Sequence, residues 1–419
     1  MKEITMDNGI KIVYEQRSGE LTSFSIAFDA GAVVEEKNEN GLAHVVEHMI
    51  FKGTKTKKEE EINKLCDEYF GFNNAMTNYP YVVYYGTCLS QDFDKAFGLY
   101  SDIILNPTFP NEGFKEEIDV ICQELREWKD DTAQYCEDEL FYNSFNERRI
   151  KNLIIGTEES VRSFSRYNVI EFYRKHYIPK NCVISIVSSL QWDEVYNMIS
   201  GYYKNWEAVY NENDMKQKYD DINKIKKTTL YEKNNPGTFV KLKKDIETAK
   251  IQYIFPIHDL SEKEIKALRV FNSYFGEGTS SLLYDIVRTK NGLAYDITST
   301  IKNENGIKLF TIYVGTSKDK IPYTIRLIDS QIENVKNNTN IFNKEKVSKL
   351  VKSIKLKRAL GLEQSIRLSL NLAVYGIMFE KPKALFEQLE NLEQINENDI
   401  LRVIEKVLKN PSVQVIEPV

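Results

Sequence analysis

Apolar residues in this chain follow two different periods, and the period predicts the local structure. Segments with β-branched and aromatic residues in partial alternation with polar ones are typical of strands, whereas apolar residues at three- and four-residue spacing are typical of helices. In the N-terminal part, the pattern predicts strands at 9–16, 22–31 and 74–90 and helices at 41–51, 91–105 and 114–145. Pro80 indicates a bulge or an edge position in the third strand. Helices and strands interleave, so the class is α with β.

One order of elements occurs twice. Helix, turn and strand follow one another at 168–187 and again at 396–418, which suggests two related halves. The second half also contains expected strands at 248–257, 293–301 and 307–315 and expected helices at 261–275 and 280–290. The stretch 208–227 is polar, charged and without clear periodicity, as linkers are. We therefore predict domains at 1–207 and 228–419, joined by a linker at 208–227.

Composition narrows the class of protein. The 419 residues are 42% hydrophobic, enough for two or three domains with a large core. The net charge of −6, from 56 basic and 62 acidic residues, is too small and too mixed to favour nucleic acid or an anionic membrane as partner. There is no signal-peptide pattern and no apolar run of roughly 18 residues. We expect a soluble, cytoplasmic protein without a membrane partner, whose five scattered cysteines are free thiols.

Histidine is scarce, yet two of the four histidines lie close together in the segment HVVEH. On a helix, His44 and His48 share one face, and Glu47 lies beside them. The remaining helix positions are apolar, so the polar groups form one narrow stripe on a helix that is otherwise suited to burial. This arrangement favours a metal-binding cleft over two incidental histidines.

A zinc site needs a third protein ligand and an open position for water. The predicted helix around EEIDVICQELREW offers carboxylates for this purpose. Glu117 and Glu124 lie two turns apart at the edge of its apolar stripe, whereas Glu112, Glu116 and Glu127 are expected to face solvent. Helix geometry alone does not choose between Glu117 and Glu124.

The motif HxxEH reverses the order found in most zinc proteases. Together with its surroundings, GLAHVVEHMIFKGT, it strongly resembles the pitrilysin, insulysin and mitochondrial processing peptidase family. Similar segments continue through nearly the whole chain: MDNGIKIVYE, FGFNNAMT, VVYY, FYRKHYIPKN and GTSSLLYDIVRTKNGLAY. The length is similar to that of the half-length, two-domain bacterial-type members. The chain departs from the family where Phe70–Gly71 stands for a glycine pair and where Leu282 stands for the usual Arg.

The resemblance implies a zinc endopeptidase and assigns roles to residues. In such an enzyme Zn²⁺ is held by His44, His48 and Glu124, and Glu47 is the general base for the attacking water. Glu117 matches a carboxylate with a supporting role, and we expect it to orient His44 through the second ring nitrogen.

The resemblance also implies an α+β fold with two homologous domains, each a sheet covered by helices on one face. The C-terminal domain should lack a zinc site and contribute Arg288 and Tyr295, which hold the peptide and stabilise the oxyanion. Without the resemblance, these two would be taken for a helix-surface Arg and a strand-core Tyr. The strand at 73–77 is predicted to be an edge to which an extended peptide adds. Contacts are expected at Asn74, Ala75 and Thr77.

Half-length members of the family pair two chains, so a clam-shell dimer is expected, either a homodimer or a heterodimer with a related subunit. Short or unfolded peptides are the expected substrates. One alternative is a non-catalytic or partner-dependent subunit, but inactive relatives typically lack one of the four residues that are intact here, His44, Glu47, His48 and Glu124. A zinc-dependent hydrolase of small amides is a third possibility, which the edge strand and the Arg288–Tyr295 pair disfavour.

Overall fold

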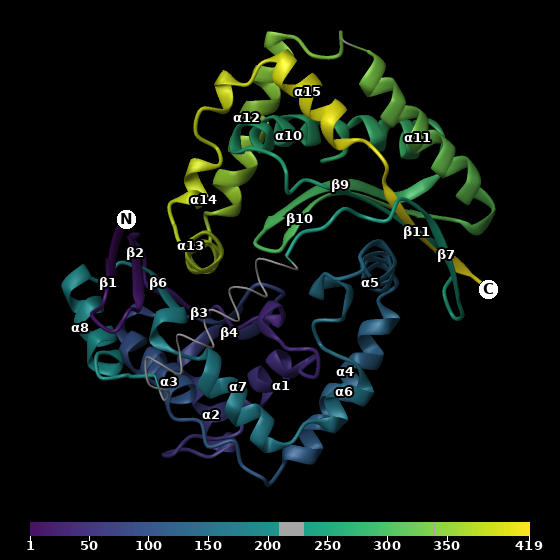
Figure 1. The fold of residues 1–419 in the computed structure, drawn as a ribbon. Coiled ribbons are helices and arrows are strands. Elements are labelled where there is room, and N and C mark those ends of the chain that lie inside the picture. The colour runs from purple at the N-terminus through teal and green to yellow at the C-terminus, as the bar shows by residue number, and fades with distance from the viewer. Residues whose placement is uncertain (209–229, 339) are drawn as a thin grey trace. The chain divides into compact units, whose positions relative to one another are not determined.

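The computed structural model describes residues 1–208, 230–338 and 340–419. These residues form two compact units, each built on one sheet (Figure 1). Counting described residues only, the first unit comprises Met1–Arg126, Leu153–Thr228 and Gly361–Leu385. The second comprises Glu127–Asn152, Thr229–Leu360 and Phe386–Val419. Apart from residue 208, the predicted linker lies outside the described residues.

The first unit contains a six-stranded sheet in the order β1-β2-β6-β3-β5-β4. Its strands are β1 (Lys2–Thr5), β2 (Lys11–Gln16), β3 (Leu21–Phe28), β4 (Phe70–Thr77), β5 (Val82–Leu89) and β6 (Cys182–Ser188). Only the pair β2–β6 is parallel. The helices that belong to this unit are α1 (Leu42–Ile50), α2 (Glu59–Tyr69), α3 (Phe93–Leu105), α6 (Glu158–Ser163), α7 (Arg166–His176), α8 (Trp192–Tyr203) and α13 (Ser365–Phe379). Helix α4 (Phe114–Asp130) begins in this unit and ends in the second.

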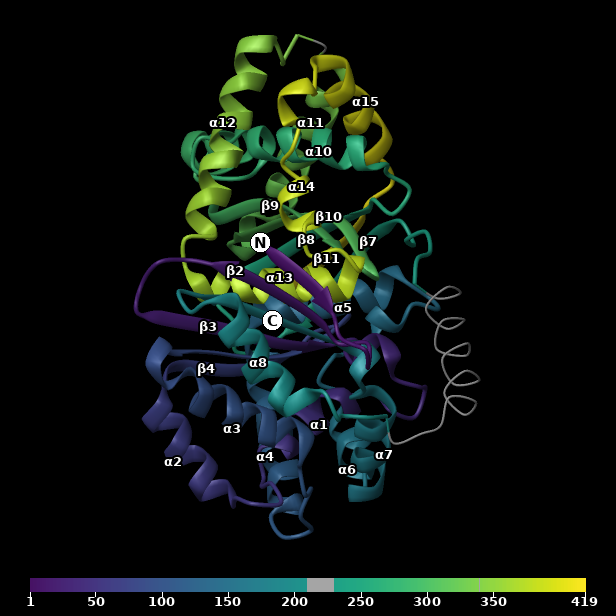
Figure 2. The same ribbon diagram turned by 90° about the vertical axis from the view of Figure 1, so that its left-hand side faces the viewer.

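Alternation along the strands gives the first sheet two apolar faces. Phe24 and Phe28 of β3 point to one face, where they contact aromatic side chains of α3 and the segment after α7. Ala27 of the same strand, with Val83 and Val183 of its neighbours, points to the other face and packs against α13. Figure 2 shows α13 along one side of this sheet and α3 and α8 on the other. Because successive strand residues point to opposite faces, one sheet supports two layers of helices.

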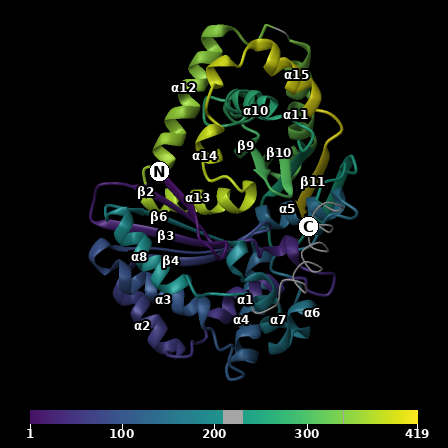
Figure 3. The same ribbon diagram turned by 60° about the vertical axis from the view of Figure 1, so that its left-hand side comes forward.

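The second unit repeats this plan with a five-stranded sheet in the order β7-β11-β8-β10-β9. Its strands are β7 (Gly237–Lys243), β8 (Ala249–Pro256), β9 (Ala294–Glu304), β10 (Ile307–Thr316) and β11 (Ser412–Pro418). Its helices are α5 (Thr132–Ser144), α10 (Glu262–Phe275), the π-helix η5 (Tyr284–Lys290), α11 (Ile321–Asn337), α12 (Lys344–Gly361) and α15 (Glu397–Val407). A short helix, α14 (Ala384–Glu387), begins in the first unit. Helices α10 and α15 pack side by side (Figure 3).

Five strands of the first sheet match the five of the second, and β1 has no counterpart. In each set of five, a parallel pair, β2–β6 or β7–β11, is followed by three strands in antiparallel pairing. Strand β4 at the edge of the first sheet corresponds to β9 at the edge of the second. The predicted pair of related α+β domains is confirmed.

The units differ from the contiguous domains predicted at 1–207 and 228–419, because each receives a helix from the other half of the sequence. Helix α13 packs on β3, β5 and β6 of the first unit, with Ser369 bonded to Ser25. Helix α5 packs on β8 and β11 of the second unit, where Asn143 donates to Gln414. In each unit, the helices of its own half cover one face of the sheet and the exchanged helix packs on the opposite face.

Most predicted elements are present, with two differences. The stretch 114–145 forms two helices, because Asp131 ends α4 and its side chain caps the first backbone amides of α5. The stretch 74–90 forms two strands, and Pro80 lies in the turn between them instead of inside a strand. No sequence pattern indicated β1, α2, α6, α8 or β7. Among the described residues, no helix is both long enough and apolar enough to cross a membrane.

Candidate functional site

Helix α1 is fixed at its start by a buried carboxylate. Gly41 precedes the helix with a φ of 93°, and a Cβ there would lie 2.7 Å from the Cα of Gly156, so only glycine fits. No side chain at this position caps the helix. Instead, Glu35 accepts hydrogen bonds from the amides of Gly41 and Ala43, the latter at 2.9 Å. The negative charge also stabilises the positive end of the helix dipole.

The two histidines of α1 meet a carboxylate of α4. Glu124 Oε2 lies 3.3 Å from His48 Nε2 and 3.6 Å from His44 Nε2, and the two rings are 4.6 Å apart between centroids. Each of the three residues offers a ligand atom, and these atoms all lie within 4.8 Å of one another. The side chain of His44 is 8% exposed and that of His48 21%. Helix geometry did not choose between Glu117 and Glu124 as the third candidate ligand, and the structure places Glu124 beside both histidines.

These distances suit one tetrahedral zinc ion. Zinc binds His nitrogen and carboxylate oxygen at about 2.0–2.2 Å, so two ligand atoms of a tetrahedral site lie about 3.4 Å apart. The two separations from Glu124 fall close to this value. Two imidazoles and one carboxylate also leave a fourth position for water, as catalytic zinc sites do. The residues present therefore fit a zinc ion.

Glu117 supports the cluster, but it bonds a different histidine from the one predicted. Its Oε1 lies 2.8 Å from Nδ1 of His48, whereas Nδ1 of His44 has no hydrogen-bond partner among the described residues. The two carboxylates lie two turns apart on α4, so that Glu124 meets Nε2 of His48 and Glu117 meets Nδ1. His48 is therefore held on both sides of its ring, and the expectation for His44 is wrong.

Lys52 completes this set of contacts. Its ammonium pairs with Oε2 of Glu117 and with Glu59 of α2, the latter at 2.7 Å. The side chains of Lys52 and Glu117 are 18% and 10% exposed. No sequence pattern singled out Lys52, which lies in the turn two residues after the end of α1.

The environment sets opposite pKa shifts on the two histidines. Burial and the neighbouring His48 lower the pKa of His44 to about 4. Burial also opposes the charge on His48, but hydrogen bonds to Glu117 and Glu124 outweigh it and raise the pKa of His48 to about 9. The contact with His48 lowers the pKa of Glu124. Burial opposes the charge on Glu117, but hydrogen bonds to His48 and Lys52 likewise lower the pKa of that carboxyl group. At neutral pH both carboxylates are ionised and His44 is neutral, whereas His48 carries a proton that it would release on binding a metal ion.

Glu47 lies beside the three potential ligands without being one of them. Its Oε2 accepts a hydrogen bond of 2.5 Å from the hydroxyl of Thr77 in β4. Burial raises the pKa of Glu47, although this hydrogen bond opposes the shift. A carboxylate with a raised pKa close to a metal-bound water is suited to general acid and base work.

Strand β4 is an edge strand, as its sequence predicted. It pairs with β5 on one side, in a register that sets Asn74 opposite Tyr85 and Ala75 opposite Tyr84. Asn74 is exposed, and Ala75 and Thr77 are half-buried. The amide of Ala75 donates to the side chain of Asn74 at 2.9 Å. One side of β4 is thus unpaired in the sheet, and the last residue of the strand, Thr77, contacts the carboxylate of Glu47.

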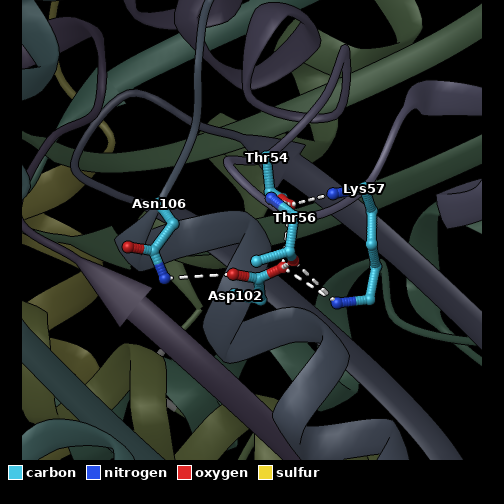
Figure 4. A network of polar contacts seen from close by, with 5 residues as sticks. All are labelled: Thr54, Thr56, Lys57, Asp102 and Asn106. Atoms are coloured by element: carbon cyan, nitrogen blue, oxygen red, sulfur yellow. Dashed lines mark hydrogen bonds and ion pairs between the residues drawn. The ribbon is translucent and has the colours of Figure 1, made fainter.

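The turn that follows α1 is anchored to α3 by one carboxylate (Figure 4). Asp102 accepts hydrogen bonds from the hydroxyls of Thr54 and Thr56 at 2.8 Å, from Lys57 at 3.1 Å and from Asn106 at 3.0 Å. Burial opposes ionisation, but these bonds lower the pKa of Asp102. They fix the chain just after Lys52, and so fix the C-terminal end of the helix that carries the histidines.

The second unit brings Arg288 and Tyr295 together. The Arg288 guanidinium lies 4.7 Å from the ring centre of Tyr284 and 5.6 Å from that of Tyr295. Arg288 belongs to the π-helix η5, a rare conformation that often occurs at functional sites. Tyr295 is the second residue of the edge strand β9 and is 87% exposed. This exposure does not agree with the alternative interpretation of Tyr295 as a residue of the strand core.

Leu282, which stands where the family usually has Arg, is partly buried and packs against the core of the second unit.

Two family models match successive parts of the chain. Residues 11–158 match the model described as insulinase (peptidase family M16), and residues 163–354 match the one described as peptidase M16 inactive domain. Among curated proteins, a zinc protease of Rickettsia bellii, named as uncharacterized, is 26% identical and aligns over 98% of this chain and 96% of its own length. The beta subunit of the mitochondrial processing peptidase of Dictyostelium discoideum is 29% identical over 52% of this chain and 46% of its own.

Solved structures share the fold. A protease from Helicobacter pylori superposes with a TM-score of 0.87 at 18% identity, covering 100% of this chain and 99% of its own. An M16-like peptidase from Alicyclobacillus acidocaldarius, named as putative, gives a TM-score of 0.81 at 17% identity, with coverage of 100% and 98%.

Proposed function

Because the chain belongs to the M16 family of peptidases, we propose that it is a zinc-dependent endopeptidase that cleaves short or unfolded peptides. The observation that carries this proposal is the joint presence of three ligand atoms within 4.8 Å of one another and a further carboxylate, Glu47, on the helix that carries the two histidines. Relatives named as zinc proteases that align over nearly the full chain support the choice of metal.

In the proposed mechanism, His44, His48 and Glu124 hold the zinc ion. Bound zinc supplies a Lewis acid that lowers the pKa of a water molecule towards ~7. Glu47 accepts the proton from the attacking water and delivers it to the leaving amine of the peptide. Thr77 fixes the orientation of the Glu47 carboxylate through its hydroxyl, and Glu117 fixes the ring of His48.

We further propose that the peptide binds as an added strand along β4, with main-chain contacts at Asn74 and Ala75. Since Thr77 ends this strand and bonds Glu47, a peptide on β4 would pass the general base. Arg288 and Tyr295, which contact each other in the second unit, are the proposed contacts to the peptide main chain and to the oxyanion. Such binding selects for extended backbone and excludes folded proteins.

A paired assembly is part of the proposal. The matches include proteins named as subunits of larger complexes, such as the mitochondrial processing peptidase beta subunit. We propose a clam-shell dimer, with either a second copy or a related subunit, in the cytoplasm.

The second candidate function is a non-catalytic or partner-dependent subunit. The match of residues 163–354 to a domain described as inactive favours it. The intact cluster of His44, His48 and Glu124 in the other part of the chain disfavours it, because a scaffold has no need of these three side chains in one place.

The variant Glu47→Gln tests the proposed function. It removes the proton acceptor but none of the three ligands, so zinc content should remain and cleavage of a quenched-fluorescence peptide library should fall by about 10²–10⁴. Zinc is measured by elemental analysis of the purified chain, and cleavage by fluorescence. The variant Glu61→Gln, on the exposed surface of α2, is the control and should retain both properties.

Wild-type protein that binds no zinc would contradict the proposal, as would equal cleavage by wild type and Glu47→Gln. Wild-type protein that binds zinc but cleaves peptides only after a related chain is added would support the partner-dependent subunit.

A further inference from the structure

A cavity of about 1150 Å³ lies in the first unit, at the end of β4 that is far from Glu47. Its lining comes from the end of α2, the beginnings of β3 and β4, the end of β5, the loop before β3, and the start of α13 with the chain that leads into it. No role in the proposed chemistry accounts for this cavity, since none of the metal ligands or the general base lines it.

The floor of the cavity is an uncovered apolar part of the sheet. Leu21 of β3 and Leu89 of β5 are paired across neighbouring strands, and the ring centre of Phe72 of β4 lies 5.9 Å from that of Tyr85. Leu21, Leu89 and Phe72 are 52%, 45% and 49% exposed. Large apolar side chains that gather in an exposed hollow usually mark a binding site.

Strand alternation places this floor on the face that carries α13. Leu21 lies two residues before Ser23, whose hydroxyl bonds Ser365 at the first turn of α13, and side chains two positions apart share a face. Helix α13 therefore covers the middle of the face, and its first turn forms one wall of the cavity with Ile366 and Leu370.

The chain that leads into α13 is held in place. The guanidinium of Arg17, from the opposite wall, donates to the carbonyl oxygens of Leu362 and Glu363 at 2.8 Å each. Two walls from distant parts of the sequence are thereby tied together, so the cavity is a built feature of the unit.

The cavity is continuous with the edge at which the peptide is proposed to bind. Phe72 belongs both to the cavity and to β4, and Thr77, which bonds Glu47, lies five residues further along the strand. At about 3.3 Å per residue, five residues span roughly 17 Å.

A bulge interrupts the pairing of β4 with β5 between Phe70 and Phe72, and bulges change the direction of the side chains beside them. Gly71 is exposed there, and a Cβ would meet nothing closer than 4.0 Å.

We propose that this cavity, with Leu21, Leu89 and Phe72 as its floor, is an anchoring site for an apolar segment of the substrate peptide about five residues from the cleaved bond. The inference rests on the proposed peptidase function and extends it to substrate choice. The volume exceeds that of a single side chain and lies just above the usual range of small-ligand sites, so the occupant is a segment with two or three bulky apolar residues. Peptides too short to reach the cavity are poorer substrates.

The test compares matched peptides on the full-length zinc-loaded protein. One quenched peptide contains the cleaved sequence alone, and two longer ones add a Leu-Phe pair five residues away, on the amino or the carboxyl side. The wild type should cleave one of the long peptides about tenfold more efficiently than the short one, mainly through a lower KM. The variant Leu21→Ser/Leu89→Ser should lose this preference and cleave the short peptide at the wild-type rate.

The control is Tyr167→Ser, which removes an apolar side chain of α7 that is 68% exposed and lies outside the cavity; it should keep the preference. Equal cleavage of all peptides by the wild type would overturn the inference, as would a preference that survives in the double variant. A change of oligomeric state in the double variant, measured by light scattering, would also overturn it, because the surface would then be a subunit interface.

Binding of a fluorescent long peptide, measured by anisotropy, separates the two proposals. If the wild type cleaves nothing but binds this peptide about tenfold more tightly than the double variant does, the anchoring site stands and the peptidase function fails. If both proteins bind it equally, the anchoring site fails.

Discussion

The two histidines of HVVEH are chemically unequal. His48 is held by Glu117 on one ring nitrogen and faces Glu124 on the other. His44 is more deeply buried, and its Nδ1 has no hydrogen-bond partner among the described residues. The strength of a histidine ligand depends on the partner of its second nitrogen, so the contacts of Glu117 control His48 alone. Because Lys52 pairs with Glu117, Lys52 affects His48 indirectly, by holding the carboxylate that bonds its ring.

The variant Lys52→Met is expected to weaken zinc binding by about tenfold, the lower end of the effect of losing an outer partner. Without the ammonium, the Glu117 carboxylate loses the charge partner that fixes it against His48. Competition with a chromophoric chelator measures the affinity. Lys52→Arg should restore most of it. Lys57→Met, which removes a lysine that pairs with Asp102 and not with Glu117, should bind zinc as the wild type does; equal affinities in Lys52→Met and the wild type would contradict the role.

Helix α5 packs on the sheet of the second unit. Its side chains contact the second sheet largely through polar groups, including Asn143 to Gln414 and Glu137 to Gln252. In the middle of α5, Asp138 accepts hydrogen bonds from Trp128 at 2.8 Å and from Gln134 at 3.0 Å. Burial raises the pKa of Asp138 to about 6 in spite of these bonds.

This shift predicts a pH-dependent stability. In the unfolded chain, Asp ionises near 3.8, so between about pH 4 and 6 the folded state binds more protons and stability falls as pH rises. The variant Asp138→Asn does not titrate. The unfolding free energy of the wild type, relative to that of Asp138→Asn, should therefore decrease by about 2–3 kcal/mol from pH 4 to pH 7. Urea unfolding at the two pH values measures this; a difference that does not change with pH would contradict it.

At the scale of the molecule, neither half of the sequence completes its own unit. The face of the first sheet that contains Val13, Ala27, Val83 and Val187 is covered by α13, whose residues come more than 150 positions after β6. The second sheet likewise receives α5 from the N-terminal half. Such an exchange makes the folding of each unit depend on the presence of the whole chain.

A fragment of residues 1–208 should therefore not fold stably. Without α13, it would expose the apolar face that this helix covers, and exposed patches of this kind lead to association. Size-exclusion chromatography and dye binding should show an aggregated or loosely packed fragment. Joining residues 361–385 to it through a flexible linker should restore a compact monomer with cooperative unfolding. A monomeric, cooperatively unfolding fragment without α13 would contradict this dependence.

Local patterns determined much of this protein. The i, i+4 spacing of His44 and His48 determined that they share a helix face, and alternation in 9–16 and 22–31 determined two strands, because these features depend only on neighbouring residues. The pattern of 73–77 likewise indicated an edge strand. The stretch 114–145 was misjudged because the break at Asp131 depends on a single capping side chain, which a periodicity spread over many residues does not reveal.

Only the tertiary structure decided which partners meet. On α4, Glu117 and Glu124 are equivalent by helix geometry, and the angle at which α4 passes α1 decides that Glu124 joins both histidines while Glu117 bonds His48. The exchange of α5 and α13 likewise depends on contacts between residues far apart in sequence. Periodicity reports which face of an element is apolar, but not which element covers it, because that choice is made by shape and packing across the whole chain.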